Sequence, residues 1–182
     1  MNKLMALFLL LICAPILLVL VILIRLTSKG PAIHWSSRVG KDNNLFLMPK
    51  FRSMYLYTPD VATHLLRESS TCITPVGKIM RKTSLDELPQ LWSILKGDMN
   101  FVGPRPALHN QDDLVTMRDK YGVSKLKPGV TGWAQINGRD EISIPEKVKL
   151  DTFYLENESL SFDLKIIFLT FFKIFGDKKV SH

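Results

Sequence analysis

Residues 81–106 read RKTSLDELPQLWSILKGDMNFVGPRP, and two adjacent acids, Asp86 and Glu87, lie near the start of this stretch. The apolar spacing that follows them predicts a helix over about residues 85–96, with Gly97 as its end. A helix that begins with two carboxylates, followed closely by an arginine between two prolines, is a combination suited to phosphate chemistry.

The acid pair has two interpretations. Ser84, followed three residues later by Glu87, matches a capping box, and Asp86 is an alternative cap. Either cap places both carboxylates at the positive end of a helix dipole, where acids often do no more than cap. The functional alternative is a carboxylate nucleophile beside a second acid. A Mg²⁺ ion held by Asp86 and Glu87 would then offset their repulsion from a diphosphate.

Arg105 lies between Pro104 and Pro106, whose rings fix the backbone and limit where the guanidinium can point. Arginine makes bidentate contacts with phosphate oxygens, whereas the simpler interpretation is a rigid surface turn. Three more basic residues are candidates for phosphate contacts, namely Lys50, Arg81 and Arg139. The alternative for each is a solvated surface charge.

Several common site motifs are absent from the sequence. It contains no G-x-G-x-x-G fingerprint, no G-x-x-x-x-G-K-[ST] phosphate loop, no G-x-S-x-G elbow and no D-x-D. The four histidines are scattered, so no zinc site is predicted. The net charge of +7 fits anionic lipid, phosphorylated substrates or a merely basic soluble surface. Because no basic run is interleaved with aromatic residues, we expect no nucleic-acid partner.

The chain begins with an apolar segment, Leu4 to Ile24, which carries no charge and is long enough to cross a bilayer. Neither a cleaved signal peptide nor a lipoprotein signal at Cys13 fits, so we expect a retained membrane segment over residues 1–26. Pro15, at its centre, predicts either a kinked span or a re-entrant helix–break–helix hairpin. Positive residues are concentrated after the segment, which places residues 27–182 on the cytoplasmic side in both cases.

The remaining pattern predicts an α+β chain that is mostly helical. Short extended segments are expected at residues 31–35 and 45–54, helices near residues 59–68, 75–81 and 145–157, and loops at residues 97–106 and 127–139. The phenylalanine-rich tail, residues 161–176, is either an amphipathic helix in the membrane interface or a core helix, and the apolar N-terminus favours the interface. Cys13 and Cys72 predict no disulfide framework.

Three motifs in order, RKTSLDELPQLWSILKGDMNFVGPRP, KPGVTGWAQINGR and SFDLKIIFLT, resemble the bacterial sugar transferases called small monotopic phosphoglycosyl transferases. The resemblance covers roughly residues 12–176. It implies a Mg²⁺-dependent ping-pong transfer of a sugar-1-phosphate from a UDP-sugar to undecaprenyl phosphate, with release of UMP. It also implies a re-entrant N-terminus broken at a Ser-Pro pair. The pair here is Ala14–Pro15, so a kinked span stays open.

The resemblance also implies roles for individual residues. Asp86 falls on the nucleophile that carries the covalent phosphosugar, and Glu87 falls on its metal- or proton-handling partner. Lys50, in KFRSM, and Asp163, before the last amphipathic helix, fall on positions that are functional in the family. Arg105 falls on a phosphate ligand in the family's Pro-Arg-Pro motif.

The family resemblance sets the wider expectations. The site is expected at the cytoplasmic face of a bacterial inner membrane, at the first membrane step in assembly of an O-antigen, capsule or protein-linked glycan. An N-acetylated hexosamine is the expected sugar, with galactose and glucose as alternatives. Expected partners are membrane lipid and downstream glycosyltransferases, and a homodimer is left open. The competing functions are a membrane-bound nucleotide-sugar phosphohydrolase and a non-catalytic scaffold of glycan assembly.

Overall fold

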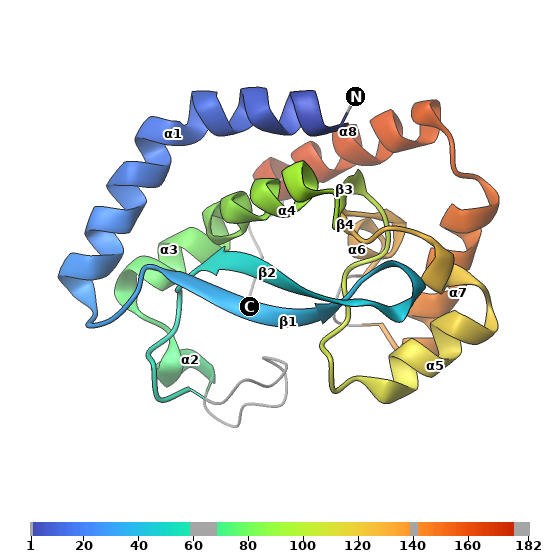
Figure 1. Ribbon diagram of the computed structural model, residues 1–182, viewed down its shortest axis with the longest axis horizontal. Helices are drawn as coiled ribbons and strands as arrows, with labels where there is room; N and C mark the ends of the chain where they lie inside the picture. Colours follow the sequence, from blue (N-terminus) through green and yellow to red (C-terminus); the bar gives the residue numbers. More distant parts are fainter. Residues whose placement is uncertain (1, 59–68, 139–141, 177–182) are drawn as a thin grey trace.

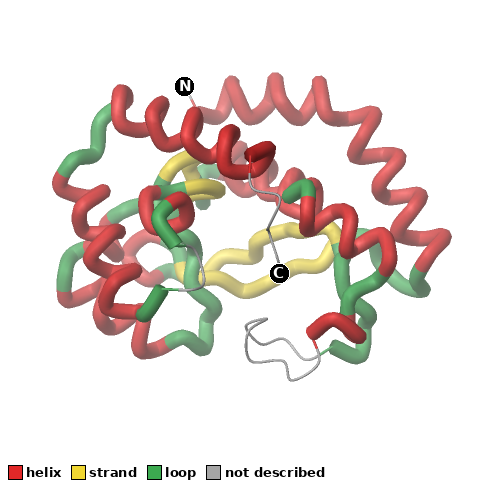
Figure 2. The backbone as a smooth tube through the Cα atoms, turned by 180° about the vertical axis from the view of Figure 1, so that it is seen from behind, coloured by secondary structure: helices red, strands yellow, loops and turns green. Residues whose placement is uncertain are grey.

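The computed structural model describes residues 2–58, 69–138 and 142–176, and within these it is mostly helical with short strands, as expected. The predicted helix at residues 59–68 lies outside the described residues. Figure 1 shows a central β-hairpin surrounded by helices, with the first part of α1 and the whole of α8 along the same upper side. Figure 2 shows the same arrangement from behind.

Helix α1, Asn2–Thr27, is continuous through Pro15 and bends along its length (Figure 1). A proline removes one helix hydrogen bond and clashes with the preceding turn, which accounts for the bend. The predicted non-helical break is therefore not seen. Most of the α1 side chains are exposed apolar groups, and by length and composition this helix could cross a membrane.

The two parts of α1 pack against different elements. Near its start, Ala6 lies in one buried cluster with Leu91 and Ile94 of α4, Leu91–Lys96. Near its end, Leu20 and Ile24 lie in a second cluster that contains Met80 of α3, Pro75–Lys82. The segment between α3 and α4 carries the acid pair, so α1 contacts the protein on both sides of that segment.

The hairpin consists of β1, Ile33–Val39, and β2, Leu45–Phe51, which pair antiparallel with His34 opposite Lys50. The turn between them contains the short 3-10 helix η1, Lys41–Asn43. The first strand is longer than the expected residues 31–35. Beyond the hairpin the chain forms a short helix, α2, Ser69–Cys72.

Helix α3 begins where the sequence predicts it, because the Thr74 side chain accepts a 2.9 Å hydrogen bond from Gly77 N. The predicted capping box at Ser84 is wrong. Ser84 adopts a left-handed conformation (φ 55°), and neither its side chain nor that of Asp86 caps the helix. The acids lie in a 3-10 helix, η3, Leu85–Gln90, and α4 follows directly and ends at Gly97 (φ 94°), as predicted.

Two predicted loops contain regular structure. Strands β3, Asn100–Val102, and β4, Gly129–Thr131, pair in parallel, and α6, Trp133–Ile136, follows β4. The sequence interpretation missed α5, Asp112–Lys120, and the 3-10 helix η4, Val123–Lys125. Helix α5 is polar along most of its length, so apolar spacing gives it little signal.

Two further helices complete the fold as expected. Helix α7, Ile144–Glu156, begins with a capping box between Ser143 and Glu146. Helix α8, Leu160–Gly176, buries Ile166 but exposes a row of apolar side chains, namely Leu164, Ile167, Phe168, Phe171 and Phe172.

Candidate active site

The structure brings three of the expected site residues into direct contact. Lys50 Nζ lies 3.0 Å from Glu87 Oε1, and an Arg105 guanidinium nitrogen lies 3.3 Å from the same oxygen. The Lys50 and Glu87 side chains are mostly buried, and that of Arg105 is about one-third exposed. Residues far apart in sequence thus meet at one carboxylate.

The hairpin explains how Lys50 reaches the acids. Side chains alternate between the two faces of a strand, so Lys50 points to the same face of β2 as Met48. Met48 is buried against Leu91 and Ile94 of α4. Lys50 therefore faces the segment that carries Glu87, and the pairing of the hairpin fixes its position.

Asp86, beside Glu87 in η3, is only 9% exposed. Burial raises the pKa of the Asp86 carboxyl above its ordinary value, and the charge of Glu87 raises it further. The charges of Lys50 and Arg81 act in the opposite direction. Asp86 is thus a desolvated carboxylate surrounded by cations, an environment suited to a nucleophile that meets an anionic substrate.

Arg81, in the last turn of α3, is held by two side chains that follow β2. Its Nε donates a 3.0 Å hydrogen bond to Ser53 Oγ, and an NH2 contact reaches Met54 Sδ at 3.3 Å. Burial lowers the pKa of Arg81, and the charges of Asp86 and Glu87 raise it. Arg81 therefore lies within electrostatic reach of both acids, and its predicted contact with a substrate phosphate stays a prediction.

Arg38 is a further cation, near Lys50, and the sequence interpretation missed it. Burial lowers the pKa of Lys50, and the nearby charges of Arg105 and Arg38 lower it further against the opposing effect of Glu87. Arg38 and Ser36 lie on the same face of β1, where Arg38 Nε donates to Ser36 Oγ at 3.1 Å. Strand alternation across the hairpin was the signal that could have found it.

The charges of the cluster do not balance. Among the described residues, the acids Asp86 and Glu87 lie with three basic side chains, Lys50, Arg81 and Arg105, and Arg38 lies near Lys50. A surplus of positive charge in a partly desolvated site attracts an anion, and planar guanidinium groups match phosphate oxygens. The site therefore suits a phosphorylated substrate.

The oxygen donors of the acid pair fit Mg²⁺ on one condition. Within the described residues, no group of three or more His, Cys, Asp or Glu side chains could hold a metal alone. Mg²⁺ often binds through one or two carboxylates, with water and substrate phosphates completing its shell. Asp86 and Glu87 can supply that protein share only when a phosphate substrate supplies part of the rest.

Asp163, another predicted site residue, makes a hydrogen bond outside this cluster. Asp163, in the first turn of α8, accepts a 2.7 Å hydrogen bond from Tyr154 Oη of α7. Burial and this contact raise the pKa of the Tyr154 hydroxyl, so it remains a donor. The contact joins α8 to α7. Arg139 lies outside the described residues.

A buried ion pair on the far side of the Arg105 turn was also missed. Asp151 Oδ2 accepts hydrogen bonds from Arg118 Nε at 3.0 Å and from an Arg118 terminal nitrogen at 2.7 Å. Asp151 is 1% exposed and Arg118 is 8% exposed. Because α5 itself was not predicted, nothing in the sequence brought Arg118 and Asp151 together.

Comparison with known proteins adds to this geometry. The chain is 40% identical over 181 residues to UDP-glucose:undecaprenyl-phosphate glucose-1-phosphate transferase of Escherichia coli (strain K12). The alignment covers 96% of this chain and 39% of the E. coli protein. It is 41% identical over 169 residues to an uncharacterized sugar transferase of Bacillus subtilis (strain 168). That alignment covers 93% of this chain and 82% of the Bacillus protein.

A third relative carries a different sugar in its name. UDP-N-acetylgalactosamine-undecaprenyl-phosphate N-acetylgalactosaminephosphotransferase of Aeromonas hydrophila is 35% identical over 162 residues, with 86% of this chain and 38% of that protein covered. The chain thus spans about two-fifths of the length of the E. coli and Aeromonas relatives. Residues 1–177 match the family described as bacterial sugar transferase, and the chain belongs to that family.

Proposed function

We propose that this chain transfers a sugar-1-phosphate from a UDP-sugar to undecaprenyl phosphate, releasing UMP and forming an undecaprenyl-diphosphate sugar. The observation that carries the proposal is the buried Asp86 beside Glu87, whose Oε1 is held by both Lys50 and Arg105. The names of the E. coli and Aeromonas relatives, which join a UDP-sugar to undecaprenyl phosphate, support the same reaction.

In the first half-reaction, an Asp86 carboxylate oxygen attacks the sugar-side phosphorus of the donor. The bond between that phosphorus and the bridging oxygen breaks, UMP leaves with the bridging oxygen, and Asp86 carries the phosphosugar. Arg105 and Arg81 bind phosphate oxygens, while Lys50 holds Glu87 in place. Mg²⁺ held by Asp86, Glu87 and the diphosphate would neutralise charge on the phosphates.

In the second half-reaction, a phosphate oxygen of undecaprenyl phosphate attacks the same phosphorus. The bond to Asp86 breaks, the carboxylate is regenerated, and the new diphosphate links lipid and sugar. Splitting the transfer in this way lets a water-soluble donor leave before a lipid acceptor binds. Asp163, through its hydrogen bond to Tyr154, is proposed to hold α8 against α7 beside this site.

The membrane part of the proposal rests on the upper side of the molecule in Figure 1. The first part of α1 and the whole of α8 lie there, and both expose apolar side chains. We infer that α1 enters the cytoplasmic face of the inner membrane as a bent, re-entrant helix and that α8 lies in the interface.

The donor sugar is a separate question. We predict an N-acetylated hexosamine, and the names of relatives include glucose, galactose and N-acetylgalactosamine. The test is therefore UMP release by the detergent-solubilised protein with Mg²⁺ across UDP-glucose, UDP-galactose and UDP-N-acetylhexosamines, with and without undecaprenyl phosphate. Sustained UMP release that requires the lipid supports the transferase and identifies the sugar. Equal release without lipid indicates a phosphohydrolase, and no release by folded protein favours a scaffold.

The raised pKa of Asp86 predicts the acid side of the pH profile. Because Asp86 attacks as a carboxylate, kcat/KM falls as the pH drops through its pKa, and that fall comes at a higher pH than for an ordinary aspartate. Glu87→Gln removes the charge of Glu87, which raises the pKa of Asp86. The fall in kcat/KM should therefore move to lower pH in this variant, even if the maximal rate drops. An unmoved profile with saturating Mg²⁺ would assign the acid limb to another group.

The topology of α1 predicts the labelling of two single cysteines. In a variant that lacks Cys13 and Cys72, Asn2→Cys at the start of α1 and Lys41→Cys in the hairpin turn should both react with an impermeant maleimide in inside-out vesicles. A re-entrant helix keeps both positions on the cytoplasmic side, and Lys41→Cys is the matched control. Labelling of Asn2→Cys in right-side-out vesicles alone would show that α1 spans the membrane.

A further inference from the structure

The turn that carries Arg105 has four consecutive backbone carbonyls, and each accepts a hydrogen bond from a different residue. Pro104 O accepts from Gly129 N at 3.0 Å, and Ala107 O accepts from Val39 N at 3.0 Å. Between them, Arg105 O accepts from Arg118 at 2.8 Å, and Pro106 O accepts from Arg38 at 3.4 Å. Backbone groups thus hold the ends of the turn, and arginine side chains hold its centre.

The hydrogen bond from Arg118 is the shorter of the two central contacts, and the Arg118 side chain is itself held in place by Asp151. Its Nε and one terminal nitrogen bind Asp151 Oδ2, which leaves the other terminal nitrogen to donate to Arg105 O. A guanidinium presents its donors in a rigid planar fork, so the position of Asp151 determines where the third donor points. Asp151 lies on α7, and the carbonyl lies on the turn that carries Arg105.

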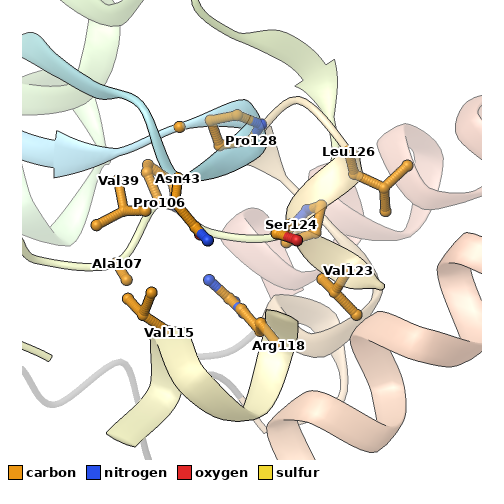
Figure 3. Close-up of a pocket in the computed structure, with 12 residues that line it drawn as sticks. Val39, Asn43, Pro106, Ala107, Val115, Arg118, Val123, Ser124, Leu126 and Pro128 are labelled. Atoms are coloured by element: carbon orange, nitrogen blue, oxygen red, sulfur yellow. The ribbon is translucent and has the colours of Figure 1, made fainter. Parts of the chain in front are cut away.

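The packing behind the turn is incomplete at one point. Figure 3 shows a small pocket behind the turn, with Arg118 extending into it from α5. Its lining includes Pro104, Pro106, Val115 and Arg118, and its volume is about 30 Å³, enough for about one water molecule. Packing therefore leaves a small void beside Arg118, and the hydrogen bond from Arg118 to Arg105 O holds the centre of the turn there together with the contact from Arg38 to Pro106 O.

We propose that Arg118, held by Asp151, is a positioning residue that sets the Arg105 side chain for the substrate phosphate. The inference rests on the proposed function. It adds that α5 and α7, which do not carry the acid pair, determine donor binding. Arg118 acts through the Arg105 backbone, and Arg105 in turn binds phosphate and Glu87. A shift of the turn therefore weakens both contacts together.

The discriminating variant is Arg118→Lys. A lysine keeps the ion pair with Asp151, but it lacks the second planar arm that reaches Arg105 O. We expect a folded protein with a thermal midpoint close to that of the wild type and a KM for the UDP-sugar raised about tenfold, the size of one weakened charge-assisted contact. The matched control is Ser143→Ala, which removes the cap of α7 without touching Arg118 and should lower the thermal midpoint but leave KM unchanged.

A double-mutant cycle with Arg105→Ala separates a positioning role of Arg118 from a general loss of folding, which would reduce kcat/KM in both backgrounds. If Arg118 acts through Arg105, Arg118→Lys should reduce kcat/KM in the wild-type background and have no further effect in Arg105→Ala. Equal reductions in both backgrounds, or an unchanged KM in folded Arg118→Lys, would overturn the positioning role while wild-type turnover still supports the transferase. Absence of UMP release from the wild type would overturn the proposed function, and the inference with it.

Discussion

Asp86→Asn should abolish the transfer, with UMP release lowered by more than about 10³-fold, because the amide cannot form the phosphosugar bond. The side chain keeps its shape and its place in η3, so the protein should remain folded. The measurement is UMP release with the preferred UDP-sugar, Mg²⁺ and undecaprenyl phosphate. A second measurement is the intact mass of wild-type protein incubated with donor alone, which should gain one phosphosugar.

Two further variants separate the nucleophile from its surroundings. Glu87→Gln should retain the mass gain while turning over more slowly, since Asp86 remains able to attack. Asp98→Asn alters an aspartate that pairs with Lys96 after α4, and it should behave as the wild type. A mass gain that persists in Asp86→Asn would assign the covalent step to another residue.

Arg118→Met should cause the largest loss of stability among the variants considered, about 3–5 kcal/mol, because it leaves the buried Asp151 carboxylate without its partner. The measurement is denaturant unfolding of the detergent-solubilised protein. Burial already raises the pKa of Asp151 in the native protein, where Arg118 opposes the shift. Without Arg118, the folded state binds that proton more tightly than the unfolded state, so the variant should regain stability as the pH falls.

The double variant Arg118→Met with Asp151→Leu is the control for this effect. Replacing both members of a buried ion pair by apolar groups is often close to neutral, so the double variant should recover most of the lost stability. It should still show a raised donor KM, because Arg105 O has lost its donor. A double variant as unstable as Arg118→Met would mean that packing, and not the unpaired charge, causes the loss.

Local signals in the sequence predicted local structure well. The helices expected near residues 75–81 and 145–157 are present as α3 and α7, whose caps Thr74 and Ser143 act within one helical turn, and Gly97 ends α4 in the left-handed conformation that glycine tolerates. The same reasoning failed at Ser84. Serine followed by glutamate is a capping signal, but Ser84 adopts a left-handed conformation and the acids occupy a 3-10 turn that contains Pro89.

The contacts that build the site depend on long-range pairing, which a single sequence does not reveal. Lys50 meets Glu87 because β2 packs on η3, and Arg38 joins them because β1 pairs with β2. The motifs identified Lys50, Glu87 and Arg105 individually, but not the shared oxygen at which they meet. Arg118 and Asp151 carried no motif, and their polar helix surroundings gave no reason to pair them.

Helix α1 holds both flanks of η3. Its start packs with Leu91, directly after η3, and its end packs in the cluster that includes Leu85, at the first position of η3. The tilt and depth of an apolar helix depend on the thickness of the hydrocarbon layer around it. A thicker or thinner bilayer would therefore shift α1 against the residues at both ends of η3. The position of Asp86, and with it the rate of its attack, would then depend on the acyl-chain length of the surrounding lipid. The membrane would then regulate the acid pair mechanically, as well as housing the acceptor.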